Sequence, residues 1–297
     1  MNYTQTLEFL FQSLPVFETQ GATAYKPGLE RITAFCRHIG NPQRNFFTIH
    51  VAGTNGKGSV AHIIASVLQQ AGYRTGLFTS PHLYRFNERF QVNGAPIPDA
   101  ALDRLAERVL AAADTLPEHP TEFELMTAVG MAFFAEQKCD IVVLEVGLGG
   151  RMDSTNVIPA PEVAVLTNIG LEHTQELGNT VALIAKEKSG ILKPGCRCVL
   201  YHQSREAEEV VEGVCRELSI PLTVTAPDTL KVQSVGLDGQ VFSYRDAGTF
   251  RISLLGEYQR YNAITALDII WSLREKGWKI SDEAIQRGLA DSKWPGR

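Results

Sequence analysis

The chain has 297 residues, 44% of them hydrophobic, so it can bury a sizeable core in one large α/β domain or two smaller domains. Its formal net charge of −5 gives no basic footprint for nucleic acid, and no apolar run reaches membrane-spanning length, so we expect neither partner. The five scattered cysteines do not form a disulfide framework, and the N-terminus carries no secretory signal, so we expect a cytoplasmic protein with reduced thiols.

Short apolar strands alternate with amphipathic helices along most of the chain. The expected strands are 46–52, 75–79, 140–146, 163–167, 197–200 and 221–225. The expected helices are 4–13, 28–39, 58–71, 99–113, 123–137, 180–188, 204–218 and 259–276. This alternation predicts an α/β fold, in which a mostly parallel sheet is covered by helices on both faces. Residues 230–254 differ, because short strands separated by turns near 238–239 and 246–248 predict a small antiparallel β flap.

A glycine-rich turn, HVAGTNGKGS at residues 50–59, joins the first expected strand to helix 58–71. In such a turn, backbone N–H groups converge on phosphate oxygens, a lysine reaches the outer phosphates and a hydroxyl meets Mg²⁺. The sequence of this turn departs from the usual G-x-x-x-x-G-K-[ST] motif, because Val51 replaces the first glycine and Gly58 separates Lys57 from Ser59. The alternative is a flexible turn without a ligand. The order of strand, turn and helix favours a nucleotide site, formed by Gly53, Thr54, Asn55, Gly56, Lys57, Gly58 and Ser59.

Glu145 ends the expected strand 140–146, and the carboxyl ends of strands are where open α/β sheets gather their ligands. A carboxylate at this place can face the phosphate loop. Mg²⁺ needs only one or two carboxylates, together with hydroxyl and phosphate oxygens. We therefore expect Glu145 to be a metal ligand, the alternative being a carboxylate that caps a helix or a turn.

The sequence GTNGKGS resembles the phosphate-loop motif of the ATP-dependent Mur ligase superfamily. Its Gly58-Ser59 ending looks like that of the folate branch, folylpolyglutamate synthase and dihydrofolate synthase. Further segments agree in family order, namely TSPH at 79–82, RFNER at 85–89, LEVGLGGRMD at 144–153, EKSGI at 187–191 and WPGR at 294–297. The resemblance implies that 1–297 is the ATP-binding domain, closed by the WPGR segment. It also implies that the family's carboxy-terminal, glutamate-binding Rossmann-like domain is absent here.

The same resemblance assigns residues to a catalytic centre with ATP and two Mg²⁺ ions, for which Mn²⁺ can substitute. Ser59 and Glu145 would hold the first ion, and Ser80, Glu145 and His173 the second. Lys57, His173 and Lys188 are the implied catalytic residues. Lys188 is expected to be carbamylated by CO₂, because a carbamate suits a metal site better than an ammonium does. The alternative is a solvated helix lysine paired with Glu187 or a residue one turn away.

The remaining implied contacts concern the nucleotide base and the folate. Asn262 would reach the adenine, unless it is merely exposed on its helix, and Arg297 would contact an ATP phosphate. Phe123 either stacks on a pterin ring or belongs to the core. Asp153 either hydrogen-bonds the pterin or orders its loop, and Arg151 of the same stretch is assigned to the substrate.

The implied activity is that of an ATP-dependent acid–amino-acid ligase, which adds L-glutamate to folates, to dihydropteroate or to both through an acyl phosphate. We expect a monomer, and we expect residues 1–297 alone to be inactive. A P-loop small-molecule kinase, a peptidoglycan Mur ligase and an inert nucleotide-binding module are the alternatives. The kinase would not require EKSGI or WPGR, and Gly58-Ser59 with RFNER disfavours the peptidoglycan enzyme.

Overall fold

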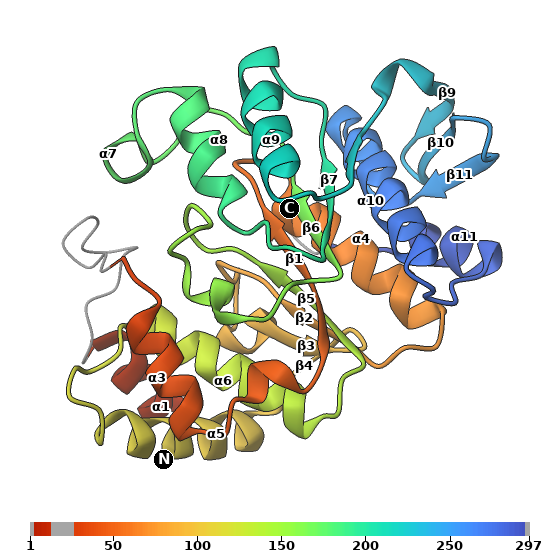
Figure 1. The fold of residues 1–297 in the computed structure, drawn as a ribbon. Helices are drawn as coiled ribbons and strands as arrows, with labels where there is room; N and C mark the ends of the chain where they lie inside the picture. The colour runs from red at the N-terminus through yellow and green to blue at the C-terminus, as the bar shows by residue number, and fades with distance from the viewer. Residues whose placement is uncertain (1–2, 13–26, 295–297) are drawn as a thin grey trace.

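The computed structural model describes residues 3–12 and 27–294, and its centre is a twisted eight-stranded sheet (Figure 1). The strands are β1 Phe47–Ala52, β2 Thr75–Phe78, β3 Phe90–Val92, β4 Ala95–Pro96, β5 Ile141–Glu145, β6 Val163–Leu166, β7 Arg197–Leu200 and β8 Leu222–Val224. Their order in the sheet is β4-β3-β2-β5-β1-β6-β7-β8, with β3 and β4 antiparallel and the other neighbours parallel. Every predicted strand is confirmed. The prediction omitted β3 and β4, which are too short to show a period of alternation.

The helices lie on both faces of this sheet (Figure 1). They are α1 Tyr3–Gln12, α3 Glu30–His38, α4 Lys57–Gln70, α5 Asp99–Ala113, α6 Glu122–Glu136, α7 Thr174–Leu177, α8 Val181–Ser189, α9 Arg205–Glu217, α10 Glu257–Glu275 and α11 Asp282–Ala290. Each predicted helix is present with ends within about two residues of those expected. The prediction was wrong to place no helix after residue 276, since α11 begins at the N-cap Ser281, whose hydroxyl accepts the Ala284 N–H. Within the described ranges, no helix combines the length and the apolar composition needed to cross a bilayer.

Successive side chains of each strand point to opposite faces of the sheet, so the core is divided between the two faces. In β1, Ile49 and Val51 point to one face, where they pack with α4, α10 and α11. Ala52 points to the other face and joins the residues of α8 and α9. On that second face, α3, α5 and α6 cover the β2 and β5 side. Because successive side chains of a strand point to opposite faces, a sheet covered on both sides must be apolar almost throughout, as the predicted strands are.

The predicted flap is confirmed as a three-stranded antiparallel sheet of β9 Leu230–Gly236, β10 Gly239–Tyr244 and β11 Thr249–Ile252. Tyr244 of β10 donates its hydroxyl hydrogen bond to Asp268 of α10 over 2.8 Å, and its ring stacks on Trp271. The flap is therefore fastened to α10, the helix whose first turn faces the phosphate loop.

Candidate functional site

The turn after β1 has a backbone that only glycine fits at two places. Gly53 has φ 150°, and a Cβ atom there would lie 1.8 Å from the Thr167 hydroxyl oxygen. Gly56 has φ 86° and forms the N-cap of α4. L side chains rarely adopt these angles, so the glycines allow the chain to turn sharply and bring the first backbone N–H groups of α4 to the cavity.

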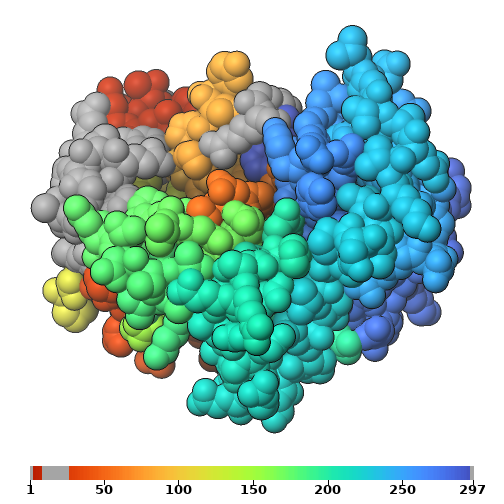
Figure 2. Space-filling model, turned by 90° about the horizontal axis from the view of Figure 1, so that it is seen from above, coloured from red at the N-terminus to blue at the C-terminus, as the bar shows by residue number. Residues whose placement is uncertain are grey.

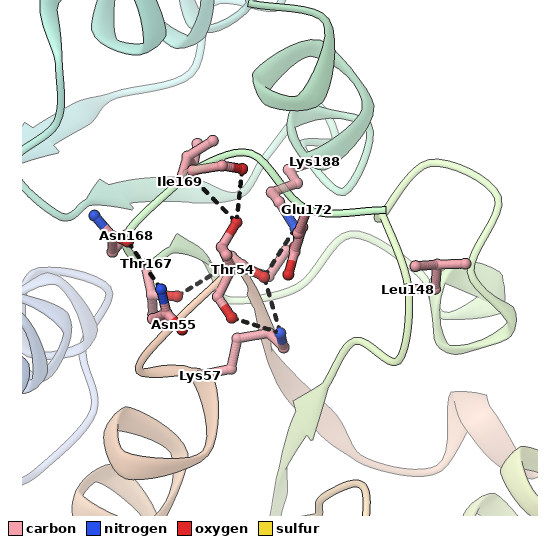
Figure 3. Close-up of polar contacts among 12 residues, drawn as sticks. Thr54, Asn55, Lys57, Leu148, Thr167, Asn168, Ile169, Glu172 and Lys188 are labelled. Atoms are coloured by element: carbon pink, nitrogen blue, oxygen red, sulfur yellow. Dashed lines mark hydrogen bonds and ion pairs between the residues drawn. The ribbon is translucent and has the colours of Figure 1, made fainter. Parts of the chain in front are cut away.

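A second loop, after β6, holds this turn in place. The Asn168 carbonyl accepts the N–H groups of Thr54 at 2.7 Å and Asn55 at 3.3 Å (Figure 3). The Thr54 hydroxyl donates to the Gly170 carbonyl at 3.2 Å and accepts the Gly170 N–H at 3.0 Å. Since β1 and β6 are parallel neighbours, their carboxyl ends place both loops at the same edge of the sheet.

The loop opens on a cavity of about 790 Å³, which lies in the size range of small-molecule sites. Lys57 and Ser59 of α4 line it together with Ser80, Glu145 and His173, which come from the ends of β2, β5 and β6. Figure 2 shows the orange surface of the segment near residue 55 between the green and blue surfaces that surround it. The structure thus brings into one cavity the residues that the sequence analysis assigned to the metal ions and to the outer phosphates.

Glu145 is the carboxylate at the centre of this arrangement. It pairs in register with Val51 of β1, so it ends its strand beside the phosphate loop, and only 4% of its surface is exposed. Its Oε2 accepts the Ser80 backbone N–H at 3.2 Å. The carboxylate faces the cavity that Ser59 and Lys57 line, rather than capping a helix. Carboxylate and hydroxyl oxygens are the donors that Mg²⁺ prefers, so these residues fit such an ion.

His173 lies at the start of α7 with φ 43° and lines the same cavity. Imidazole is a less common ligand of Mg²⁺ than oxygen donors are, and suits Mn²⁺ or softer ions better. Among the residues that the structure describes, no three His, Cys, Asp or Glu side chains gather as a metal cluster. An ion here would therefore depend on hydroxyl, water and phosphate oxygens besides Glu145.

Two lysines reach the carbonyl oxygen of Gly53. Lys57 Nζ donates to it at 2.9 Å and to the Thr54 carbonyl at 3.3 Å, while its side chain stays at the cavity wall. Lys188 Nζ, on α8, donates to the same oxygen at 2.8 Å and forms a 2.5 Å ion pair with Glu172 (Figure 3).

Lys188 is 1% exposed, so the alternative of a solvated lysine paired with Glu187 is wrong. Burial lowers the pKa of its ammonium below the ordinary value of 10.5, and the nearby Glu172 carboxylate opposes that shift.

The residues assigned to the folate differ in where they lie. Phe123 lines the cavity, and its ring also packs against Gly147, where a Cβ atom would lie 2.4 Å from it. Asp153 is 5% exposed and accepts the N–H groups of Gly147 and Leu148, at 3.0 and 2.9 Å, so it orders its loop. Burial raises the pKa of this carboxyl above its ordinary value, and these hydrogen bonds oppose the rise.

Arg151 is not brought to the cavity. Its guanidinium forms a bidentate ion pair with Glu187 at 2.8 and 3.2 Å, and the Arg151 side chain is 55% exposed. The two ends of one short stretch, Arg151 and Asp153, therefore face different surroundings, which spacing in the sequence does not reveal.

Asn262 is 5% exposed, so the alternative of an exposed helix residue is wrong. Its Nδ2 donates to Gln259 at 3.0 Å, and its Oδ1 would lie 2.6 Å from a Cβ atom on Gly56. Asn262 therefore packs directly against the phosphate loop, while Tyr258 and Gln259 of the same helix line the cavity. Arg297 lies outside the described residues.

Several residues near the cavity received no role in the sequence analysis. Glu172 forms an ion pair with Lys188. It directly precedes His173 in the sequence, but no local pattern predicts its pairing. Arg89, which is buried, donates to His82 Nδ1 at 2.9 Å, and both line the cavity. Trp294 also lines it, although it stands far along the chain. Only the family motifs could have indicated that these side chains lie near the cavity. Local periodicity predicts which residues are buried, but it does not predict which distant residues they contact.

Most of this chain is similar to known proteins. The Mur ligase middle domain family matches residues 51–270. The dihydrofolate synthase/folylpolyglutamate synthase of Bacillus subtilis (strain 168) is 41% identical over 283 residues, which cover 92% of this chain and 66% of that protein. The chain thus spans about two thirds of the length of this relative.

Two solved structures are similar over nearly the whole fold. A folylpolyglutamate synthase in an FPGS-AMPPCP-folate complex has TM-score 0.90 and 36% identity, covering 100% of this chain and 73% of that one. Escherichia coli FolC in complex with DHPP and ADP has TM-score 0.82 and 32% identity, covering 100% of this chain and 67% of that one. The first structure holds AMPPCP with folate, and the second holds ADP with DHPP.

Proposed function

Because the chain belongs to the Mur ligase family, in the branch of folylpolyglutamate and dihydrofolate synthases, we propose that it binds ATP at residues 53–59 and uses it to join a folate-type acid to L-glutamate. The observation that carries the proposal is the meeting of Lys57, Ser59 and Glu145 around one cavity at the carboxyl ends of parallel strands. Relatives that hold a nucleotide with folate or DHPP support the same pair of ligands.

The nucleotide would be held by the residues that form the turn and by the helices beside it. The backbone N–H groups of the phosphate loop and the partial positive charge at the start of α4 suit the phosphates. Lys57 would leave the Gly53 and Thr54 carbonyls to meet the outer phosphates. Asn262, beside Gly56, is our candidate for the adenine end, and Arg297 for a phosphate contact.

Divalent ions fit the oxygen donors at the other side of the loop. Ser59 and Glu145 would hold one Mg²⁺, and Ser80, Glu145 and His173 a second, with Mn²⁺ able to substitute. When bound, such ions neutralise the negative charge that develops during phosphoryl transfer. The fit rests on the Glu145 carboxylate, which is buried yet faces the cavity.

The acid substrate would lie on the Phe123 side of the cavity. The ring of Phe123 offers a flat apolar surface to a pterin, and Asp153 keeps the neighbouring loop in shape. We give Arg151 only an indirect part, because it braces that loop through Glu187.

The chemistry follows from these placements. The substrate carboxylate attacks the γ-phosphorus of ATP, the bond to the β,γ-bridging oxygen breaks, and an acyl phosphate and ADP form. The amine of L-glutamate then attacks the acyl carbon, phosphate leaves, and the amine loses a proton as the amide forms. Lys57 and the loop amides stabilise the charge on the transferred group, and the cavity holds the carboxylate in line.

We also propose that Lys188 becomes carbamylated. Burial lowers the pKa of its amine, which increases the share of the neutral form that attacks CO₂. The ammonium first loses one proton, the neutral amine then adds to CO₂ as the nitrogen–carbon bond forms, and a second proton is released, so that a positive charge is replaced by a negative one. The ion pair with Glu172 must break in this step, because two neighbouring anions repel each other.

The test measures nucleotide binding and phosphate release in separate arms. Titration of residues 1–297 with an ATP analogue and Mg²⁺ should show binding that Glu145→Gln weakens strongly, whereas Glu206→Gln, an exposed control on α9, should not. Phosphate release that requires both a pterin acid and L-glutamate supports the ligase. Transfer of the γ-phosphoryl group to an acceptor hydroxyl, with ADP formed and no phosphate released, would support a kinase. Phosphate release that depends on a peptidoglycan precursor would support a peptidoglycan Mur ligase.

We expect ligation only from a protein of the relatives' full length, of which this chain spans about two thirds. Steady glutamate ligation by residues 1–297 alone would contradict that expectation.

A further inference from the structure

The indole of Trp294 lies against the first turn of α4, across the place where Gly58 separates Lys57 from Ser59. A Cβ atom added to Gly58 would lie 1.7 Å from Trp294 Cη2 and 2.5 Å from Cζ2. Real Cβ contacts are never this short, so any side chain at position 58 must displace the ring or the helix turn. The extra glycine in the phosphate loop therefore has a partner far along the chain.

His62, one turn further along α4, completes the contact. Its ring stacks on Trp294 with centroids 4.5 Å apart and planes 28° from parallel. His62 Nδ1 also lies 2.9 Å from the Gly58 carbonyl oxygen, within hydrogen-bonding distance. The indole thus covers the side of the turn that runs from Gly58 to His62, and Trp294 also lines the cavity.

The segment that carries Trp294 is fastened to both α4 and the flap. In α11, Gly288 packs so tightly on α4 that a Cβ atom would lie 2.4 Å from Val67 Cα, and its carbonyl accepts the Ser66 hydroxyl at 2.7 Å. Beyond α11, the Ser292 carbonyl accepts the hydroxyl of Ser253 at 2.6 Å, just after β11. Trp294 therefore stands two residues after an anchored point.

We propose that Trp294 is a positioning residue, which holds the first turn of α4 so that the phosphate-loop amides and Ser59 face the nucleotide, and that Gly58 exists to admit its ring. This inference rests on the proposed function, because it takes the cavity beside the loop to be the nucleotide site. It extends that function by linking the segment after α11 to the geometry of the loop, through packing and not through contact with the substrate.

A double-mutant cycle tests the link. Gly58→Ala and Trp294→Ala should each weaken the binding of an ATP analogue by about tenfold or more, because each lets the turn move. The double variant should bind no more weakly than the worse single variant, since the three atoms nearest to the added methyl group all belong to the indole that this variant lacks. Trp294→Phe, which keeps an aromatic ring against His62, should recover part of the affinity. Trp271→Phe, an aromatic change on α10 away from the loop, is the matched control.

Additive losses in the cycle would overturn the proposal, because they would mean that Trp294 and Gly58 act separately. The proposal would also be overturned if Trp294→Ala and Trp271→Phe lowered the melting temperature equally and weakened analogue binding equally. That result would show that Trp294 contributes to stability alone.

A second measurement separates this inference from the proposed function. The chain has three tryptophans, so Trp271→Phe with Trp278→Phe leaves Trp294 as the single emitter. In that background, without nucleotide, Gly58→Ala should shift the emission to longer wavelength as the ring becomes hydrated. An ATP analogue should alter the emission only when Gly58 is present. If no analogue binds but the shift occurs, the nucleotide function fails and the contact stands; if the analogue binds and Gly58→Ala causes no shift, the contact fails.

Discussion

Two lysines share one acceptor in this protein, and their surroundings differ sharply. Lys57, in the first turn of α4, donates to the Gly53 carbonyl from the wall of an open cavity. Lys188, on α8, donates to the same oxygen from the interior, where it is 1% exposed and paired with Glu172. An accessible ammonium can exchange a carbonyl for a phosphate, whereas a buried one is held by its partners and pays a desolvation cost. We therefore expect the accessible lysine to be available to a ligand, whereas the unmodified Lys188 is held in a buried ion pair.

Removing the accessible lysine should have the largest effect on function. For Lys57→Ala we expect glutamate ligation by the protein of the relatives' length to fall by about 10² to 10³-fold, since one charge-stabilising donor is lost from the phosphoryl-transfer site. Analogue binding to residues 1–297 should weaken as well, with little change in the melting temperature. Lys186→Ala, an exposed lysine on α8, is the control and should alter neither. Unchanged binding in Lys57→Ala would show that the lysine stays on the carbonyls and never meets phosphate.

Removing the partner of the buried lysine should mainly affect folding. Glu172→Gln leaves the Lys188 ammonium without its counter-charge, and we expect the free energy of unfolding at neutral pH to fall by about 2 kcal/mol. Denaturant titration measures this change, with Glu176→Gln on α7 as the control. A loss no larger than that of the control would mean that the pair contributes no more than a surface ion pair.

The pH dependence of this variant sharpens the comparison. The pKa of Lys188 is lowered in the folded state, so between that value and the ordinary 10.5 the unfolded chain binds more protons. Stability then rises with pH through this window, because the buried amine loses its costly charge. In Glu172→Gln the pKa falls further, so the deficit should be largest near neutrality and shrink as pH rises. A deficit that is constant over this range would contradict the assignment.

Replacing the buried lysine by an apolar residue should cost less than isolating it. Lys188→Met keeps most of the volume and removes the desolvated charge, while Glu172, which is 20% exposed, can be hydrated. We expect the free energy of unfolding to change by no more than about 1 kcal/mol. Ligation by the protein of the relatives' length should nevertheless be lost, and intact-mass analysis in bicarbonate should show one added CO₂ in the parent and none in the variant. Full activity of Lys188→Met would exclude a part for the carbamate.

The smallest effect should come from the exposed ion pair next to the buried one. Glu187 and Lys188 are neighbours on α8, but Glu187 pairs with Arg151 at the surface. Arg151→Ala should change the free energy of unfolding by about 0.5 kcal/mol at most, and less in high salt. The affinity for a pterin acid should stay as in the parent. A large loss of that affinity would indicate that Arg151 contacts the substrate.

Much of this fold could be predicted because its signals are local. The apolar runs of β1 and β5, the 3.6-residue period in α4 and the turn residues of the flap are each patterns among residues only a few positions apart. The omitted elements are those with weak local signals, such as β3 and β4, or with a cap that was overlooked, such as Ser281 before α11. The phosphate loop was found for the same reason, since its strand, turn and helix are continuous in the sequence.

The sequence by itself therefore determined the layered α/β architecture, the phosphate loop and the carboxylate that faces it, together with the family that these motifs indicate. Only the tertiary structure decided that Lys188 is buried against Glu172, that Arg151 turns away from the cavity, and that Trp294 lies on Gly58. The physical reason is the distance along the chain over which each kind of interaction acts. Periodicity and turn chemistry act between near neighbours, whereas burial and pairing depend on which distant segments the crossover connections bring together.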